Sequence, residues 1–421
     1  MRGKKAIATV LATALTLSFG LTATGCGDKN KGVDGKTTVR ISRWALECEK
    51  DVFRNWTAEF TAANPDIAIE WEFTPYTSHF DRLRTDLLSS KAADIIFVNN
   101  WGWEPYSDIE IFEDLGSVTA LADTFDSLID AAQNALTQGN KVVGMPIGMV
   151  SRVPVVNTAD FKTANVQVPY ERRTSFTGTE LVELLGNVAD ASGRDMGINI
   201  TLTDALTLFL ASVDSPIVTE NNTIGCNTAA GVKAVKEFVD FALSGRVVPL
   251  AQNQSGSYGS PDTAIMTGRV VAGYTNPGGY ISLLDAGYSL AAIPSLKASD
   301  GADTILADFN TLVMPKFSKV KDEAYRVMNW MLSKEAQLKY AKFADLPTSE
   351  VAFDEVMTDT ETWDPTLYSA FGVGVDNIYV APAMSTDFQT LLGGALKNLL
   401  DGVYTPAQFC QKLADDGPKY L

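Results

Sequence analysis

The sequence has a single histidine, His79, among its 421 residues. Serine–histidine–aspartate and cysteine–histidine nucleophile systems each need a histidine beside a nucleophile, and the sequence has no G-x-S-x-G motif. One histidine also excludes the H-E-x-x-H zinc motif, the four cysteines lack zinc-binding spacing, and Walker and G-x-G-x-x-G loops are missing. We therefore expect no enzyme, no metal and no cofactor. A secreted glycan hydrolase stays open as an alternative because it needs only two carboxylates, although the sequence shows no barrel-like βα repeat.

Basic residues are also scarce, since 34 Lys and Arg stand against 51 Asp and Glu and give a net charge of −17. Nucleic-acid phosphates and anionic lipid surfaces both demand clusters of Lys and Arg. We therefore expect no nucleic-acid partner and no electrostatic adhesion to membranes. The negative charge mainly favours solubility and does not select a fold.

Long apolar runs are missing except at the N-terminus, where Ala6–Gly20 is an unbroken run of apolar and small residues. This run is shorter than the ~20 residues that a membrane-spanning helix needs. It follows the basic residues Arg2, Lys4 and Lys5. A basic start, a short apolar core and small residues at the cleavage point are typical of a signal peptide.

The residues Ala23-Thr24-Gly25-Cys26 resemble the lipobox of bacterial lipoproteins, although leucine is commoner than alanine at its first position. The resemblance implies lipidation of Cys26 and anchoring on the extracytoplasmic face of the cell membrane. We predict a signal peptide over residues 1–25 and a polar, lipidated tether over 26–36. Removal of the signal peptide changes the net charge to −20, which is 31 minus 51. An ordinary secretory signal with a chance cysteine is the alternative.

Three cysteines remain after Cys26, namely Cys48, Cys226 and Cys410. An odd number in an exported protein leaves at least one thiol unpaired. Cys226 and Cys410 form a bridge if the fold brings them together, and buried free thiols are the alternative.

The first part of the mature chain alternates strand and helix patterns. Residues 37–44, 66–73 and 93–100 read as strands, while 49–65 and 79–91 read as amphipathic helices. This β-α-β-α-β order predicts one half of a doubly wound α/β fold.

Seven segments resemble, in order, those of the extracellular sugar-binding proteins related to maltodextrin-binding protein, a family of bacterial solute-binding proteins. No single segment is diagnostic, but the ordered set covers nearly all of the mature chain. One departure is Val156-Asn157, where the family has an aromatic residue before the asparagine. The segments are "FTAANPDIAIE", "KAADIIFVNNWGWEPY", "GNKVVGMPIGMVSRVPVVNTADF", "CNTAAGVKAVKEFVDFALSG", "TAIMTGRVVAGYTNPGGY", "KVKDEAYRVMNWMLSKEAQLKYAKFADLPTS" and "DGVYTPAQFCQKLAD".

The resemblance implies the type II periplasmic-binding-protein fold, in which two α/β lobes are joined by three crossings of the chain. It also implies the solute-binding component of an ABC importer, a monomer that delivers a carbohydrate to a permease. The crossings would be Met149–Val155, Ile305–Thr311 and Leu346–Ala352. Lobe one would be 37–150 plus 308–347, and lobe two 151–307 plus 348–421.

Other ligands and functions stay open at this stage. The same fold could bind a polyamine or a phosphate ester, but many aromatic residues and the lack of clustered Lys and Arg favour an uncharged ligand. A cell-surface adhesin is disfavoured because the sequence shows neither repeats nor a β-sandwich pattern.

A sugar is bound by amides, carboxylates and Arg in the plane of its hydroxyls and by an aromatic ring against its C–H face. Such side chains follow the expected strands and lie on the expected crossings, where an open α/β sheet places its ligand. Arg152 can instead form an interlobe salt bridge, "TNPGGY" can be a simple turn, and individual tryptophans can belong to the core. The candidate ligand-binding residues are Trp44, Glu47, Tyr76, Asn99, Trp101, Trp103, Met149, Arg152, Asn276, Gly279, Tyr280, Asp308, Asn310 and Trp363.

Overall fold

The computed structural model describes residues 35–45, 47–99, 110–135, 137–138, 141–219, 221–359, 361, 363–382 and 384–421. The strands are β1 (Thr37–Trp44), β2 (Ile67–Thr74), β3 (Ile95–Asn99), β4 (Thr137–Gln138), β5 (Lys141–Val142), β6 (Met145–Ser151), β7 (Val153–Asn157), β8 (Phe176–Thr177), β9 (Met196–Asn199), β10 (Val270–Thr275), β11 (Leu290–Ala292), β12 (Leu296–Lys297), β13 (Ile305–Val313) and β14 (Ile378–Val380).

The α-helices are α1 (Lys50–Ala63), α2 (Tyr76–Leu88), α4 (Thr119–Asp126), α5 (Asp130–Asn134), α6 (Thr158–Thr163), α7 (Gly178–Ser192), α8 (Leu202–Ala211), α9 (Ala229–Ala242), α10 (Leu250–Gln254), α11 (Pro261–Met266), α12 (Pro277–Asp285), α13 (Lys321–Met331), α14 (Lys334–Tyr340), α15 (Glu350–Thr358), α16 (Pro365–Gly372), α17 (Thr386–Leu400) and α18 (Pro406–Asp416). Three short 3-10 helices are η1 (Glu47–Glu49), η3 (Leu115–Ser117) and η4 (Gly417–Lys419).

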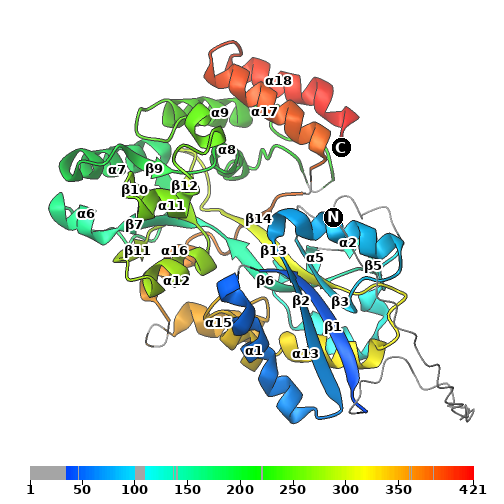
Figure 1. Cartoon of the computed structure of the whole chain (residues 1–421). Coiled ribbons are helices and arrows are strands. Elements are labelled where there is room, and N and C mark those ends of the chain that lie inside the picture. The colour runs from blue at the N-terminus through cyan, green and yellow to red at the C-terminus, as the bar shows by residue number, and fades with distance from the viewer. Residues whose placement is uncertain are drawn as a thin grey trace, which may run out of the picture.

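The first sheet has the strand order β14-β13-β3-β1-β2, with β6 paired to the other edge of β13 (Figure 1). Strand β1 is parallel to both β2 and β3, whereas β13 is antiparallel to β3 and β6. The predicted β-α-β-α-β order is therefore confirmed. Helix α2 begins at Tyr76 rather than at the predicted His79, because the extended Pro75 ends the strand and its carbonyl accepts the first helical bond from Ser78.

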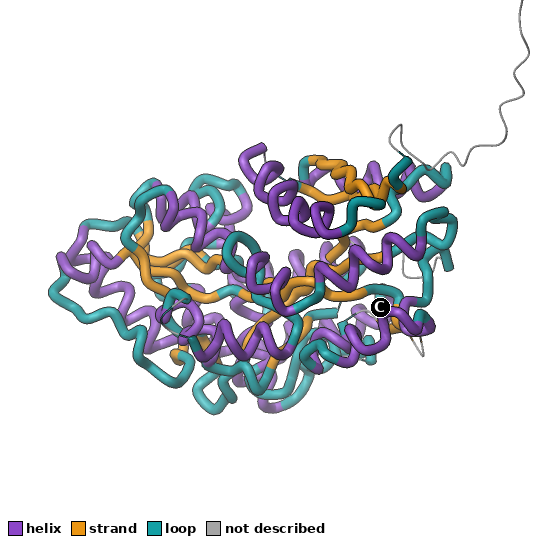
Figure 2. The backbone as a smooth tube through the Cα atoms, turned by 90° about the horizontal axis from the view of Figure 1, so that it is seen from below, coloured by secondary structure: helices purple, strands orange, loops and turns teal. Residues whose placement is uncertain are grey.

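Both faces of the first sheet are covered, as the continuous burial of β3 requires. Ile95 and Phe97 face a core that includes α1, α13 and α14. Ile96 and Val98 face the opposite side and pack with Leu83 of α2. Strands lie inside and helices outside in the view from below (Figure 2).

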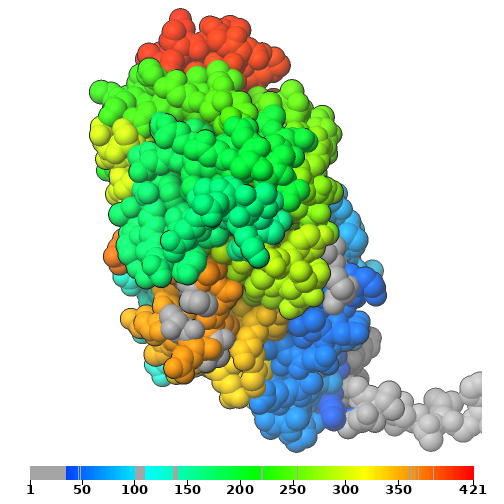
Figure 3. Space-filling model, turned by 90° about the vertical axis from the view of Figure 1, so that its left-hand side faces the viewer, coloured from blue at the N-terminus to red at the C-terminus, as the bar shows by residue number. Residues whose placement is uncertain are grey.

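The second sheet has the order β11-β7-β10-β9 and is covered by α7, α8, α9 and α11. Helices α17 and α18 pack against α9 at the far end of this half. In the space-filling view, the residues around the second sheet (green) lie above those of the first sheet (blue), and the C-terminal helices (red) form the top (Figure 3).

The chain passes from the first sheet to the second between β6, which ends at Ser151, and β7, which begins at Val153. It returns through β13, whose nine residues are all buried. Farther on, Leu346 bridges to Met149 of β6, and α16 then packs against β11 of the second sheet. These passages fall at or next to the predicted crossings, while the lobe boundaries stay a prediction.

Candidate functional site

Side chains from three parallel strands meet at the carboxyl edge of the first sheet. Trp44 ends β1, Tyr76 begins the helix after β2, and Asn99 ends β3. The Trp44 and Tyr76 rings meet edge-to-face with centroids 5.5 Å apart, and Asn99 Nδ2 donates to the Tyr76 hydroxyl at 3.2 Å. Asn99 is buried and Trp44 half-buried, whereas Tyr76 is 47% exposed. We call Trp44, Tyr76, His79 and Asn99 the strand-end cluster.

His79 is the most deeply buried member of the strand-end cluster. Its Nε2 lies 3.0 Å from the Phe97 carbonyl, which can only accept, so Nε2 carries the proton and Nδ1 accepts from the Thr74 hydroxyl at 3.0 Å. The ring also packs against Trp44, with centroids 5.2 Å apart. Burial lowers the pKa of His79 from 6.5 to about 4, although the hydrogen bond to Phe97 acts in the opposite direction. His79 is therefore neutral, and its two hydrogen bonds fix the ring against which Trp44 packs.

Three further residues near this edge were predicted to bind ligand and are not assigned to the strand-end cluster. Trp101 and Trp103, with the lipidation site Cys26, lie outside the described residues. Glu47 lies on η1 just after β1, is exposed, and forms an ion pair with Lys50. A role for Glu47 in ligand binding stays a prediction.

The two predicted residues of the first crossing lie in different surroundings, one in the core and one beside a carboxylate. Met149 is fully buried between Phe309 and Leu346, and its side chain belongs to the core of the first half, so its role as a ligand contact stays a prediction. Arg152 is half-buried and lies 3.9 Å from the Asp204 carboxylate at the start of α8. Both residues lie in the predicted lobe two, so this ion pair is not the interlobe salt bridge, and a ligand contact of Arg152 stays a prediction. Burial raises the pKa of Asp204, and Arg152 opposes that shift.

The second and third crossings are joined by buried hydrogen bonds. Asp345 Oδ2 accepts from Asn310 Nδ2 and from the Tyr340 hydroxyl, both at 2.7 Å. Asp308 is buried on the same strand and accepts from the backbone N–H of Phe309 at 2.8 Å. The side-chain amide of Asn310 is therefore already hydrogen-bonded to Asp345. A ligand contact of Asn310 stays a prediction.

Gln337 of α14 makes a second set of bonds between crossings. Its Nε2 donates to the Ile147 carbonyl at 2.8 Å, and its Oε1 accepts from the backbone N–H groups of Thr348 and Ser349 at 2.7 and 3.1 Å. The Thr348 hydroxyl donates to Pro146 O at 2.7 Å. No sequence motif marked this glutamine, because its partners lie on β6 and beyond α14.

The "TNPGGY" segment caps a helix at the end of β10. Asn276 Oδ1 accepts from the N–H of Gly279 at 2.8 Å and so caps α12. A Cβ at Gly279 would lie 2.5 Å from the Thr275 hydroxyl, which explains the glycine. Tyr280 is fully buried and donates to Asp364 at 2.9 Å. Its hydroxyl joins α12 to the start of α16, and a ligand contact of Tyr280 stays a prediction.

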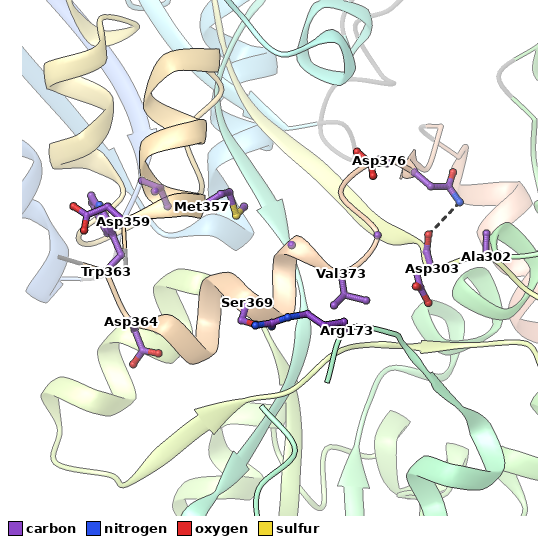
Figure 4. Close-up of a pocket in the computed structure, with 14 residues that line it drawn as sticks. Arg173, Ala302, Asp303, Met357, Asp359, Trp363, Asp364, Ser369, Val373 and Asp376 are labelled. Atoms are coloured by element: carbon purple, nitrogen blue, oxygen red, sulfur yellow. Dashed lines mark hydrogen bonds between the residues drawn. The ribbon is translucent and has the colours of Figure 1, made fainter. Parts of the chain in front are cut away.

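A cavity of about 610 Å³ lies between α15, α16, the start of β13 and the loop before β8 (Figure 4). Trp363 is the only sequence-predicted residue among its described lining residues, and the strand-end cluster does not reach it. Four aspartates and one arginine supply its charge: Asp303, Asp359, Asp364, Asp376 and Arg173.

At least three of the cavity carboxylates already have partners, and one of them is Asp359, which accepts from the backbone N–H of Glu361 at 3.1 Å. Asp303 forms an ion pair with Lys297 at 2.8 Å, and Asp364 caps α16 while it accepts from Tyr280. Arg173 donates to the Ser369 hydroxyl across the cavity. Apart from Trp363, sequence reasoning missed this site, because its aspartates are scattered along the chain and belong to no motif.

Among residues 35–421, with the gaps given above, no helix is long and apolar enough to cross a bilayer. The same residues hold no group of three or more His, Cys, Asp or Glu side chains that could bind a metal.

Comparison with known proteins identifies the fold and the family. The model of the family described as bacterial extracellular solute-binding protein matches residues 49–338, which is more than half of the chain. A binding protein of Brucella abortus (strain 2308) is 22% identical over 295 residues, covering 67% of this chain and 69% of its own.

Two solved structures share the architecture. The substrate-binding protein Lmo0181 of Listeria monocytogenes, in complex with cycloalternan, has a TM-score of 0.74 and 17% identity, covering 91% of this chain and 98% of its own. The GacH receptor of Streptomyces glaucescens, solved unliganded and with acarbose, has a TM-score of 0.74 and 18% identity, covering 91% and 97%. The predicted type II two-lobe fold is therefore confirmed, and the chain belongs to the bacterial extracellular solute-binding protein family.

Proposed function

We propose that this protein is the solute-binding component of an ABC importer, that it binds a mono- or oligosaccharide between its lobes, and that it delivers this ligand to a permease. The strand-end cluster carries the proposal. An exposed tyrosine ring, a half-buried tryptophan and a buried amide at one sheet edge supply the apolar face and the hydrogen-bonding group that a sugar requires. The two related structures were solved with cycloalternan and with acarbose, which supports the same ligand class.

The proposed mechanism is capture without a chemical step. The ligand first binds the strand-end cluster on lobe one (37–150 plus 308–347), and lobe two (151–307 plus 348–421) then closes over it. The Arg152–Asp204 ion pair lies directly beyond β6, so it orients the start of lobe two relative to the crossing. The closed monomer docks on the permease, and the lipid on Cys26 keeps it at the membrane.

Anchoring through Cys26 gives a direct prediction. The Cys26→Ser variant should move from the membrane fraction of the expressing bacterium to the soluble fraction, because it lacks the sulfur that takes the lipid. Immunoblotting of the two fractions measures the distribution. Cys48→Ser is the matched control and should remain with the membrane. A Cys26→Ser protein that stays in the membrane fraction would contradict the anchor.

Ligand binding is tested with the full chain in detergent against a panel of mono- and oligosaccharides. A ligand at 100 times its Kd should stabilise the protein by about 2.7 kcal/mol, from RT ln(1 + [L]/Kd), which thermal unfolding detects. Tyr76→Ala should weaken binding of the responding sugar about tenfold, since stacking contributes about 0.5–1.5 kcal/mol beyond burial. Tyr420→Ala removes a similarly exposed tyrosine at the C-terminal end and should bind normally.

A second candidate ligand is a cationic solute such as a polyamine, because the cavity has four aspartates against one arginine. The panel therefore includes polyamines and phosphate esters, and mass spectrometry of each mixture looks for released products. A response to a polyamine alone, insensitive to Tyr76→Ala, would replace the carbohydrate by a cation. Released sugar products would show a glycan hydrolase instead.

A further inference from the structure

Cys226 and Cys410 lie far apart in sequence but side by side in the fold. Cys226 precedes α9 and Cys410 lies on α18, and both are fully buried in the core of the second half. Both thiols are free, and they lie close enough for each to shift the pKa of the other. The residues that follow each cysteine are also bonded, since Asn227 Nδ2 donates to Gln411 Oε1 at 3.2 Å. Two separate contacts therefore hold the two segments in register.

We propose that Cys226 and Cys410 form a disulfide bond in the exported protein and so fasten α18 to the segment that leads into α9. Disulfides form and persist in the oxidising compartments that exported proteins reach. The Asn227–Gln411 bond and the shared core hold the two cysteines beside each other, as a disulfide requires. Neither cysteine belongs to the strand-end cluster, the crossings or the cavity, so the proposal is independent of the ligand.

The reaction is a thiol–disulfide exchange with a disulfide-bearing oxidant. The neighbouring Cys410 thiol, together with burial, raises the pKa of the Cys226 thiol, whereas the neighbouring Cys226 thiol lowers the pKa of Cys410. The Cys410 thiolate attacks one sulfur of the oxidant and releases the other as a thiolate. Cys226 loses its proton and attacks the Cys410 sulfur, which releases the second oxidant sulfur. Two protein thiols are oxidised and one oxidant disulfide is reduced to two thiols.

The position of α18 explains how a buried pair meets an oxidant. Helix α18 packs on α17 and α9 at the far end of the second half, and its thiol becomes accessible when the helix has not yet packed or opens locally. Once formed, the bond closes a loop of about 180 residues and restricts the unfolded chain. Both segments belong to the second half, so the disulfide bond does not link the two halves of the molecule.

Peptide mapping tests the bond directly. The full chain is expressed with its own N-terminal segment, recovered from the bacterial membrane, alkylated while unfolding and digested with trypsin without reductant. The expected product is one species that links peptides 195–233 and 398–412 and separates on reduction. Recovery of both peptides alkylated, even after the chain has been refolded with oxidised glutathione, would overturn the proposal.

A stability measurement gives a second readout. Reductant should lower the melting temperature of the wild-type chain by about 5 °C, because it frees the unfolded state from the loop constraint. The Cys226→Ser/Cys410→Ser double variant should not respond to reductant, whereas Cys48→Ser should respond like the wild type. A wild-type melting temperature that is unchanged by reductant would count against a formed bond.

Discussion

Replacement of Gln337 by leucine should lower the free energy of unfolding by about 3–5 kcal/mol. Gln337 is 0% exposed, and its amide bonds the Ile147 carbonyl and the N–H groups of Thr348 and Ser349. Leucine has a similar volume but no polar atom. The substitution leaves one buried carbonyl and two buried N–H groups without this partner, and each such loss costs about 1–3 kcal/mol.

Urea unfolding measures this effect through the midpoint, with the slope expected to stay unchanged. The matched control is Glu335→Gln on the same helix, where the exposed carboxylate forms an i,i+4 pair with Lys339 at 3.0 Å. That change should alter stability by less than about 0.5 kcal/mol. A loss below about 1 kcal/mol for Gln337→Leu would mean that water or neighbouring side chains replace the three bonds.

Acidification should destabilise the protein through His79 by about 3 kcal/mol in total. The unfolded histidine titrates near 6.5 and the folded one at about 4, so the unfolded state takes up the proton first as the pH falls. The stabilisation is complete above pH 6.5 and is lost progressively between pH 6.5 and 4. The fall of the His79 pKa from 6.5 to about 4, at about 1.4 kcal/mol for each pH unit, corresponds to roughly 3 kcal/mol.

Because the chain has one histidine, this prediction can be isolated. His79→Gln keeps a donor for the Phe97 carbonyl but does not titrate. The stability of the wild type and of this variant is measured as a function of pH. The contributions of the carboxylates are the same in both proteins, so the difference between the two curves gives the contribution of His79. The single imidazole resonance in a proton NMR titration should have its midpoint near pH 4. A midpoint near 6.5 would show that the imidazole is solvated, and the acid-dependent difference should then vanish.

Much of the first half could be predicted from the sequence because its signals are local. The alternation of apolar residues gave the strands and helices, and parallel strands necessarily bring Trp44, Tyr76 and Asn99 to one edge. The order of the resembling segments then gave the two-lobe fold. These predictions needed no contact between distant parts of the chain.

The rest of the candidate site depends on partners that are distant in sequence. Tyr280 looked like a ligand contact because it follows a glycine pair at a strand end, but its hydroxyl partner Asp364 comes from a separate helix. Met149 is buried because Leu346 returns alongside it. Neither pairing leaves a periodic or spaced pattern in the sequence, so only the folded structure identifies them.

Strand β13 also sets an order of events for the folding chain. Its Asn310–Val313 segment covers the edge of β3, but about 200 residues separate the two strands. The residues of the second sheet emerge within that interval and can fold first, while β3 keeps an open edge that invites pairing with another chain. Completion of the first sheet must therefore wait until most of the polypeptide has been synthesised, and a chain truncated before Ile305 should aggregate through that edge.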